Sequence, residues 1–169
     1  MPSDPGLRRI ILRPGDVAFA EGATILQTLL GSCVAITFWD PRFKVGAMCH
    51  YMLPVCPPGR DPAHAGRYAD ATLDLITEGF KARGIRPEAL HVRMFGGGDM
   101  FKRTLSLKKR LIGELNIEAG RYLLEELGYA ILEEDLAGEV SRRVIFHLPT
   151  GTVEVERGGV LGVSGRIKP

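Results

Sequence analysis

Two apolar runs that flank a turn-like segment constrain the fold of this chain most strongly. They cover residues 29–36 and 45–54, and Asp40-Pro41-Arg42-Phe43 lies between them. Runs of this kind on either side of a turn are typical of neighbouring antiparallel strands. A hairpin brings its paired positions together, so we expect Cys33 in the first run and His50 in the second to meet at one end of it. A thiol becomes a useful nucleophile when a nearby imidazole takes its proton.

Two helical patterns lie in the middle of the chain. The spacing of Tyr68, Leu73, Ile76 and Phe80 predicts one helix. A second helix is predicted from an N-cap at Asn116 to a C-terminal glycine at position 128.

Strand-like segments cluster before and after these helices, at residues 8–12, 16–19, 23–29, 33–39, 44–53, 89–95, 129–133, 142–148 and 152–156. This order is not an alternating βαβ pattern. It predicts an α+β fold, a layered sandwich with a largely antiparallel, mixed sheet and two main helices outside.

Length and composition indicate an ordinary globular chain. The 169 residues are 45% hydrophobic and 25% charged, so we expect a single domain over residues 1–169. The ends, residues 1–7 and 157–169, are expected to be loose tails. A net charge of only +2 argues against nucleic acid as a partner.

The chain shows no pattern for membrane insertion or secretion. No apolar run approaches the roughly 18 residues that span a membrane. The N-terminus is polar and proline-rich, without a basic segment followed by an apolar one. A cytoplasmic location is therefore expected.

Three cysteines, Cys33, Cys49 and Cys56, are an odd number and form no C-x-x-C pair, which argues against a disulfide framework. Cys49 and His50 are adjacent, so in a strand they point to opposite faces and do not share a metal ion. We expect no metal and no cofactor. The run Gly96-Gly97-Gly98 lacks the G-K-[ST] of a phosphate loop. It suits a close backbone approach, either to the Cys33 and His50 strands or to substrate.

Several segments resemble the CheD family of chemoreceptor glutamine deamidases. They run in order from residue 28 to 116: Thr28–Ala35, Asp40-Pro41, Gly46–Pro54, Gly66-Arg67-Tyr68-Ala69-Asp70, Phe95–Phe101 and Ile112-Gly113-Glu114-Leu115-Asn116. Leu115 stands where the family usually has arginine. A weaker match is Thr150-Gly151. The resemblance implies a layered α/β/β fold.

It also implies an activity, the hydrolysis of glutamine side-chain amides on the cytoplasmic coiled coils of methyl-accepting chemotaxis receptors. In that chemistry Cys33 would be the nucleophile and His50 the general base and acid, with a thioester intermediate. The backbone N–H groups of the turn at Gly31 and Ser32, or of Cys33, would stabilise the oxyanion. The family also docks onto the CheC phosphatase in some bacteria.

The sequence leaves several candidates for the group that orients His50. The family has a threonine six residues before the cysteine, but here Gln27 occupies that position and Thr28 follows it. A one-residue offset in a strand reverses the face of a side chain. Gln27, Thr28 on a local bulge, or the backbone alone could serve. We favour Gln27, whose carbonyl oxygen can accept the ring N–H, so Gln27→Ala should reduce activity more than Thr28→Ala.

Other hypotheses concern the surface. A protein substrate needs an open site, and the proline-rich loop from Pro54 to Ala65 is expected to form one wall of its groove. Met100 and Phe101 suit either a partner contact or the core. Two alternative functions stay open, a non-enzymatic docking module and a cysteine hydrolase of a small amide or ester.

Overall fold

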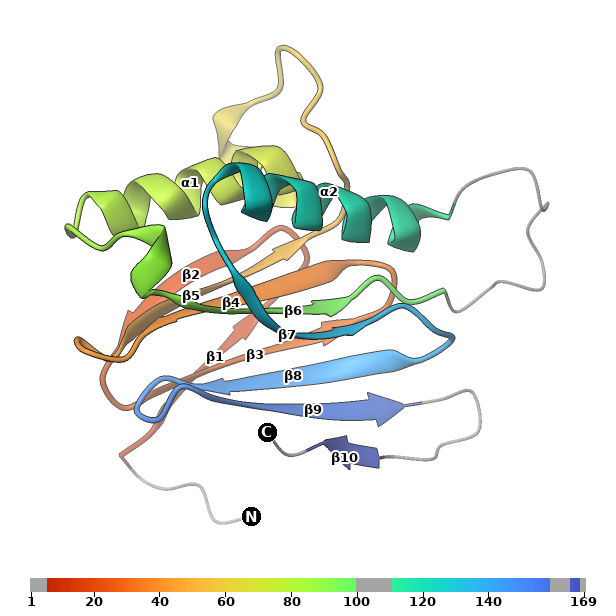
Figure 1. The fold of residues 1–169 in the computed structure, drawn as a ribbon. Coiled ribbons are helices and arrows are strands. Elements are labelled where there is room, and N and C mark those ends of the chain that lie inside the picture. The colour runs from red at the N-terminus through yellow and green to blue at the C-terminus, as the bar shows by residue number, and fades with distance from the viewer. Residues whose placement is uncertain (1–5, 100–110, 159–164, 168–169) are drawn as a thin grey trace.

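The computed structural model describes residues 6–99, 111–158 and 165–167. Figure 1 shows three layers, with two helices over one sheet and a second sheet on its other side. The central sheet has the order β2-β5-β4-β6-β7 and the outer sheet the order β1-β3-β8-β9-β10. The strands of the central sheet are Val17–Glu21 (β2), Val34–Asp40 (β4), Val45–Tyr51 (β5), His91–Gly96 (β6) and Ile131–Leu136 (β7).

The strands of the outer sheet are Arg8–Leu12 (β1), Thr24–Leu30 (β3), Ser141–His147 (β8), Thr152–Gly158 (β9) and Gly165–Ile167 (β10). The two main helices are Ala69–Lys81 (α1) and Ile112–Glu126 (α2), and short 3-10 helices cover Pro62–Arg67 and Pro87–Ala89. Only β1–β3 and β6–β7 pair in parallel among these strands. The α+β fold and the largely antiparallel, mixed sheets are therefore confirmed.

The β4–β5 hairpin forms as the sequence predicts. The Asp40 carboxylate accepts hydrogen bonds from the backbone N–H groups of Arg42 at 2.7 Å and Phe43 at 3.2 Å. A side chain that bonds the backbone two and three residues on closes a turn without help from the rest of the fold. The register then pairs His50 with Ala35, and Ala35 follows Cys33 by two residues.

Alternation along β4 and β5 divides the core into two parts. Ile36 and Cys49 belong to the cluster between the central sheet and the helices, whereas Ala35 and Met48 belong to the cluster between the two sheets. His50 is on the same face as Met48, because side chains alternate along a strand. Cys49 and His50 consequently point into different layers.

Three predictions about the chain's elements need correction or fall outside the description. Helix α2 begins at Ile112, so Asn116 lies inside the helix and does not cap it. The segment from Arg157 is not wholly a loose tail, because Arg157 and Gly158 end β9 and residues 165–167 form β10 against it. Met100 and Phe101 lie outside the described residues.

Candidate active site

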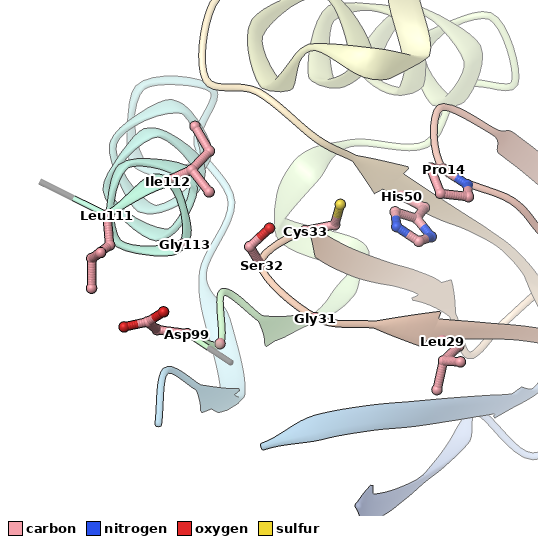
Figure 2. Close-up of a pocket in the computed structure, with 11 residues that line it drawn as sticks. Pro14, Leu29, Gly31, Ser32, Cys33, His50, Asp99, Leu111, Ile112 and Gly113 are labelled. Atoms are coloured by element: carbon pink, nitrogen blue, oxygen red, sulfur yellow. The ribbon is translucent and has the colours of Figure 1, made fainter. Parts of the chain in front are cut away.

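Cys33 and His50 line one cavity at the end of the β4–β5 hairpin. Cys33 lies in the short turn between β3 and β4, and His50 in β5 points toward the same space (Figure 2). The cavity has a volume of about 410 Å³. Its other lining residues come from the turn at Gly31 and Ser32, from Pro14, Leu29, Gly98 and Asp99, and from Leu111, Ile112 and Gly113 at the start of α2.

Thr28 is the side chain that contacts the imidazole. Its Oγ1 lies 2.7 Å from His50 Nδ1, and it also donates a hydrogen bond to the Leu12 carbonyl at 2.9 Å. A hydroxyl has one hydrogen to donate. If that hydrogen goes to Leu12, then Oγ1 accepts from His50, so Nδ1 carries the ring proton. The other ring nitrogen, Nε2, is then unprotonated and can accept a proton.

The preference for Gln27 as the residue that contacts His50 is wrong, because the Gln27 side chain lies on the other face of β3. Gln27 Oε1 accepts a hydrogen bond from Arg9 on the outer face of the outer sheet. The even-numbered residues of β3, Thr24, Leu26, Thr28 and Leu30, are buried against the central sheet. The β3–β8 register is unbroken from Ile25 to Leu30, so Thr28 reaches His50 from a regular strand, without a bulge.

Burial keeps both members of the Cys33–His50 pair neutral. It lowers the pKa of His50 to about 4, against the opposing effect of the Asp16 carboxylate. It also raises the pKa of the Cys33 thiol above its ordinary value. At neutral pH the pair is therefore a thiol beside a neutral imidazole, and the imidazole can act as a base toward the thiol during attack.

The turn that carries Cys33 is held through its carbonyl groups. Gly98 N–H donates to the Gly31 carbonyl at 2.9 Å, and Gly97 N–H donates to the Cys33 carbonyl at 2.8 Å. The Ser32 carbonyl accepts from Asn116 Nδ2 at 3.1 Å. Within the described part of the chain, the backbone N–H groups of Ser32 and Cys33 donate to no acceptor. They remain available as a pair of donors beside the thiol.

The glycine-rich segment approaches this turn closely, as the sequence predicts. A Cβ on Gly96 would collide with the Cys33 carbonyl oxygen, and Gly96 has a φ of +110°. A Cβ on Gly113, at the start of α2, would lie 2.5 Å from the Gly97 carbonyl oxygen. Glycine at these positions lets the turn, the glycine-rich segment and α2 stack backbone against backbone.

The sequence did not predict two groups that hold the site in place, the Leu12 carbonyl and the Asn116 amide. The Leu12 carbonyl has no side-chain signature and is found only from the parallel β1–β3 pairing. Asn116 did carry a signal, because it stands between Gly113 and Gly120 on the helix face that packs inward. A polar residue on a buried helix face needs a partner there.

The loop from Pro54 to Ala65 does not line the cavity that holds Cys33. Pro54 and Val55 instead line a second, largely apolar groove against α2, with Leu115 and Tyr122 on its other side. The expectation that this loop forms one wall of the groove for a protein substrate stays a prediction, and the loop does not contribute to the cavity itself. The rim of that cavity carries Leu29, 62% exposed, and Ile112, 38% exposed.

The described residues contain neither a candidate metal-binding cluster nor a membrane-spanning helix. No group of three or more His, Cys, Asp or Glu side chains among them could hold a metal ion. None of the helices in the described ranges is long and apolar enough to cross a membrane.

A cysteine beside a neutral imidazole, with a hydroxyl on the far ring nitrogen, is the arrangement of the cysteine hydrolases. A comparison with known protein families is consistent with this arrangement. The family model described as "CheD chemotactic sensory transduction" matches residues 52–157. The chain belongs to the CheD family.

Curated relatives match over nearly the whole chain. A protein of Pseudomonas syringae pv. syringae, named "Probable chemoreceptor glutamine deamidase CheD", is 40% identical over 159 residues, which cover 92% of this chain and 88% of the relative. "Probable chemoreceptor glutamine deamidase CheD 1" of Chromobacterium violaceum is 36% identical, covering 92% and 81%. A relative of the same description from Archaeoglobus fulgidus is 33% identical, covering 91% and 98%.

Proposed function

We propose that this protein is a chemoreceptor glutamine deamidase. It converts specific glutamines on the cytoplasmic domains of methyl-accepting chemotaxis receptors to glutamate and releases ammonia. Family membership supports the activity and the substrate class. The observation that carries the proposal is the hydrogen bond that His50 Nδ1–H donates to Thr28 Oγ1, because it leaves Nε2 unprotonated in a side chain that lines the same cavity as Cys33.

In the first half-reaction the Cys33 sulfur attacks the side-chain carboxamide carbon while His50 takes the thiol proton. The tetrahedral intermediate carries a negative oxygen, and the N–H groups of Ser32 and Cys33, which bond no acceptor among the described residues, would stabilise it. His50 then returns the proton to the nitrogen, the C–N bond breaks, and ammonia leaves. The product is a thioester between Cys33 and the substrate's former glutamine.

In the second half-reaction His50 takes a proton from water as the water oxygen attacks the thioester. Collapse of this second intermediate breaks the C–S bond and releases the glutamate side chain. The proton held by His50 returns to the Cys33 sulfur, so the enzyme ends in its starting state. The sum is one amide and one water converted to one acid and one ammonia.

The rim of the cavity favours a protein substrate over a small amide. Leu29 and Ile112 are large, exposed apolar side chains on either side of the catalytic pair. An amphipathic helix that presents a glutamine among apolar and small residues would cover them on binding. The cytoplasmic location and a CheC-like phosphatase partner stay predictions that accompany this assignment.

The test is mass spectrometry of a purified receptor cytoplasmic domain after incubation with the protein. Wild type should convert particular glutamines to glutamate, and Cys33→Ala should convert none. Cys56→Ala is the matched control, because this cysteine lies in the loop from Pro54 to Ala65 and does not line the cavity. Conversion by Cys33→Ala would refute the assigned nucleophile. No conversion by folded, reduced wild type across several receptors would favour the docking-module alternative.

A further inference from the structure

Asn116 joins the segment that carries Cys33 to the segment that carries His50. Its side chain is completely buried. The amide Nδ2 donates to the Ser32 carbonyl at 3.1 Å and to the Met52 carbonyl at 2.9 Å. Ser32 precedes Cys33, and Met52 follows His50 by two residues. One NH₂ group therefore bonds a carbonyl next to Cys33 and a carbonyl two residues beyond His50.

The two ends of the Asn116 amide differ in their partners. The Asn116 Oδ1 is buried without a partner among the described residues, and an unpaired buried oxygen is unfavourable. The opposite amide orientation would face an oxygen toward two carbonyl oxygens, so the two acceptors determine that Nδ2 lies there. Among the described residues, the Asn116 side chain therefore bonds only the carbonyls of Ser32 and Met52.

The bond to Ser32 also sets the direction of a potential oxyanion donor. In a trans peptide the C=O and the following N–H point in opposite directions. Because Asn116 holds the Ser32 carbonyl toward α2, the Cys33 N–H must point away from α2. The peptides on either side are fixed by Gly98 and Gly97. The carbonyls of Gly31, Ser32 and Cys33 are thus each hydrogen-bonded, and the bond to Ser32 is the one that comes from a side chain.

Helix α2 is anchored at the same point. Tyr51 Oη, next to His50, donates to the Asn116 backbone carbonyl at 2.6 Å. Gly113, one turn earlier, lets the helix approach the glycine-rich segment. The position of the Asn116 amide is therefore set by the strand on one side and by backbone packing on the other.

We propose that Asn116 is a positioning residue for the deamidation reaction. It orients the Ser32–Cys33 peptide so that the Cys33 N–H stabilises the oxyanion, and the bond to the Met52 carbonyl holds the amide in the orientation that this requires. The proposal rests on the proposed function for its chemistry. It predicts a loss confined to steps that form an oxyanion, without loss of thiol reactivity as such.

The experiment compares two reactions of Cys33 in Asn116→Ala. Iodoacetamide alkylates the sulfur without forming an oxyanion, whereas a peptide aldehyde that mimics the glutamine side chain adds to it as a hemithioacetal and does form one. For Asn116→Ala we expect kcat on the receptor domain and affinity for the aldehyde to fall by about tenfold to 10³-fold, the upper value being the cost of a lost oxyanion donor. KM and the alkylation rate should stay within about threefold of wild type, because neither depends on that donor.

Two further variants keep the test decisive. Leu124→Ala removes a fully buried side chain from the same helix, away from the turn, so it reports general loosening and should leave the ratio of aldehyde affinity to alkylation rate unchanged. Asn116→Ser keeps one donor and takes the place of Asn116→Ala if that variant does not fold. Its losses in kcat and in aldehyde affinity should be smaller than those of the alanine variant.

A parallel fall in alkylation and in aldehyde affinity would mean that Asn116 only supports the fold, and unchanged values for both would mean that it has no role; either result overturns the proposal. If wild type deamidates no receptor, the proposed function fails. The ratio of aldehyde affinity to alkylation rate then still decides the positioning role, because neither reaction requires a receptor.

Discussion

Thr28→Val tests the orientation of His50 most directly. Valine has nearly the shape of threonine, so the change removes the hydroxyl and little else. The His50 Nδ1–H and the Leu12 carbonyl then both lose their partner in a site where Thr28 and His50 are each 1% exposed. An unsatisfied buried polar group costs about 1–3 kcal/mol. Because two groups lose their partner, the free energy of unfolding should fall by about 2–6 kcal/mol.

The effect on catalysis has a different origin. Without the hydroxyl, nothing selects the ring proton on Nδ1 or holds the ring plane toward Cys33. A positioned general base contributes about 10²–10⁴-fold to rate. We therefore expect kcat for receptor deamidation to fall by about 10²-fold or more, measured by mass spectrometry of the target glutamines in a time course below the unfolding temperature.

Thr28→Ser and Gln27→Ala are the controls. Serine keeps the hydroxyl, so its kcat should remain within about tenfold of wild type, clearly above the valine variant. Gln27 bonds Arg9 on the opposite face of β3, so its truncation should change kcat by less than about twofold. Full activity in Thr28→Val, or a fall in Gln27→Ala as large as in Thr28→Val, would refute the assignment of Thr28.

Two further predictions follow from the neutral pair. Burial lowers the pKa of His50 to about 4, and an unfolded histidine titrates near 6.5, so between these pH values the unfolded chain binds more protons and acid favours unfolding. The free energy of unfolding should fall by about 3 kcal/mol more in wild type than in His50→Gln between pH 7 and pH 4, as measured by urea titration. Equal falls in both proteins would contradict a buried, neutral His50. Burial also raises the pKa of Cys33, so iodoacetamide alkylation of the Cys56→Ala protein should accelerate steadily into the alkaline range. A rate plateau below neutral pH would instead indicate a thiolate–imidazolium pair.

The parts of the fold that were predictable are those with local causes. The β4–β5 hairpin follows from a turn that Asp40 closes through its own neighbours. The same hairpin brings Cys33 and His50 into one cavity. The close approach of the glycine-rich segment also follows from residue type, because Gly96 has a backbone conformation that other residues rarely adopt.

The orienting residue could not be predicted, because both faces of β3 carry apolar side chains. Leu26 and Leu30 flank Thr28 on one face, and Ile25 and Leu29 flank Gln27 on the other. Alternation alone does not say which set is buried. Packing against the central sheet decides it, and Leu29 is left 62% exposed at the rim of the cavity.

The role of Asn116 and the strand β10 were also not predictable, because contacts between residues far apart in the sequence determine them. Asparagine is a good N-cap in isolation, but the helix begins four residues earlier, where Gly113 packs on Gly97. The strand at residues 165–167 exists through its pairing with residues 155–157 of β9. Tertiary contacts, which have no local signature, determine both.

The proposed catalytic pair and the side chains that contact it come from different layers of the fold. Cys33 and His50 belong to the central sheet and its leading turn, the hydroxyl of Thr28 comes from the outer sheet, and the amide of Asn116 comes from the helix layer. Burial raises the pKa of the Cys33 thiol, so the resting thiol is protonated at neutral pH. Attack then needs two groups prepared in advance: a ring nitrogen that can take the proton, and an N–H aimed at the developing oxyanion. In the proposed mechanism Thr28 prepares the first and Asn116 the second. Loss of Thr28 should therefore slow every reaction in which His50 takes the thiol proton, whereas loss of Asn116 should slow only those that form an oxyanion.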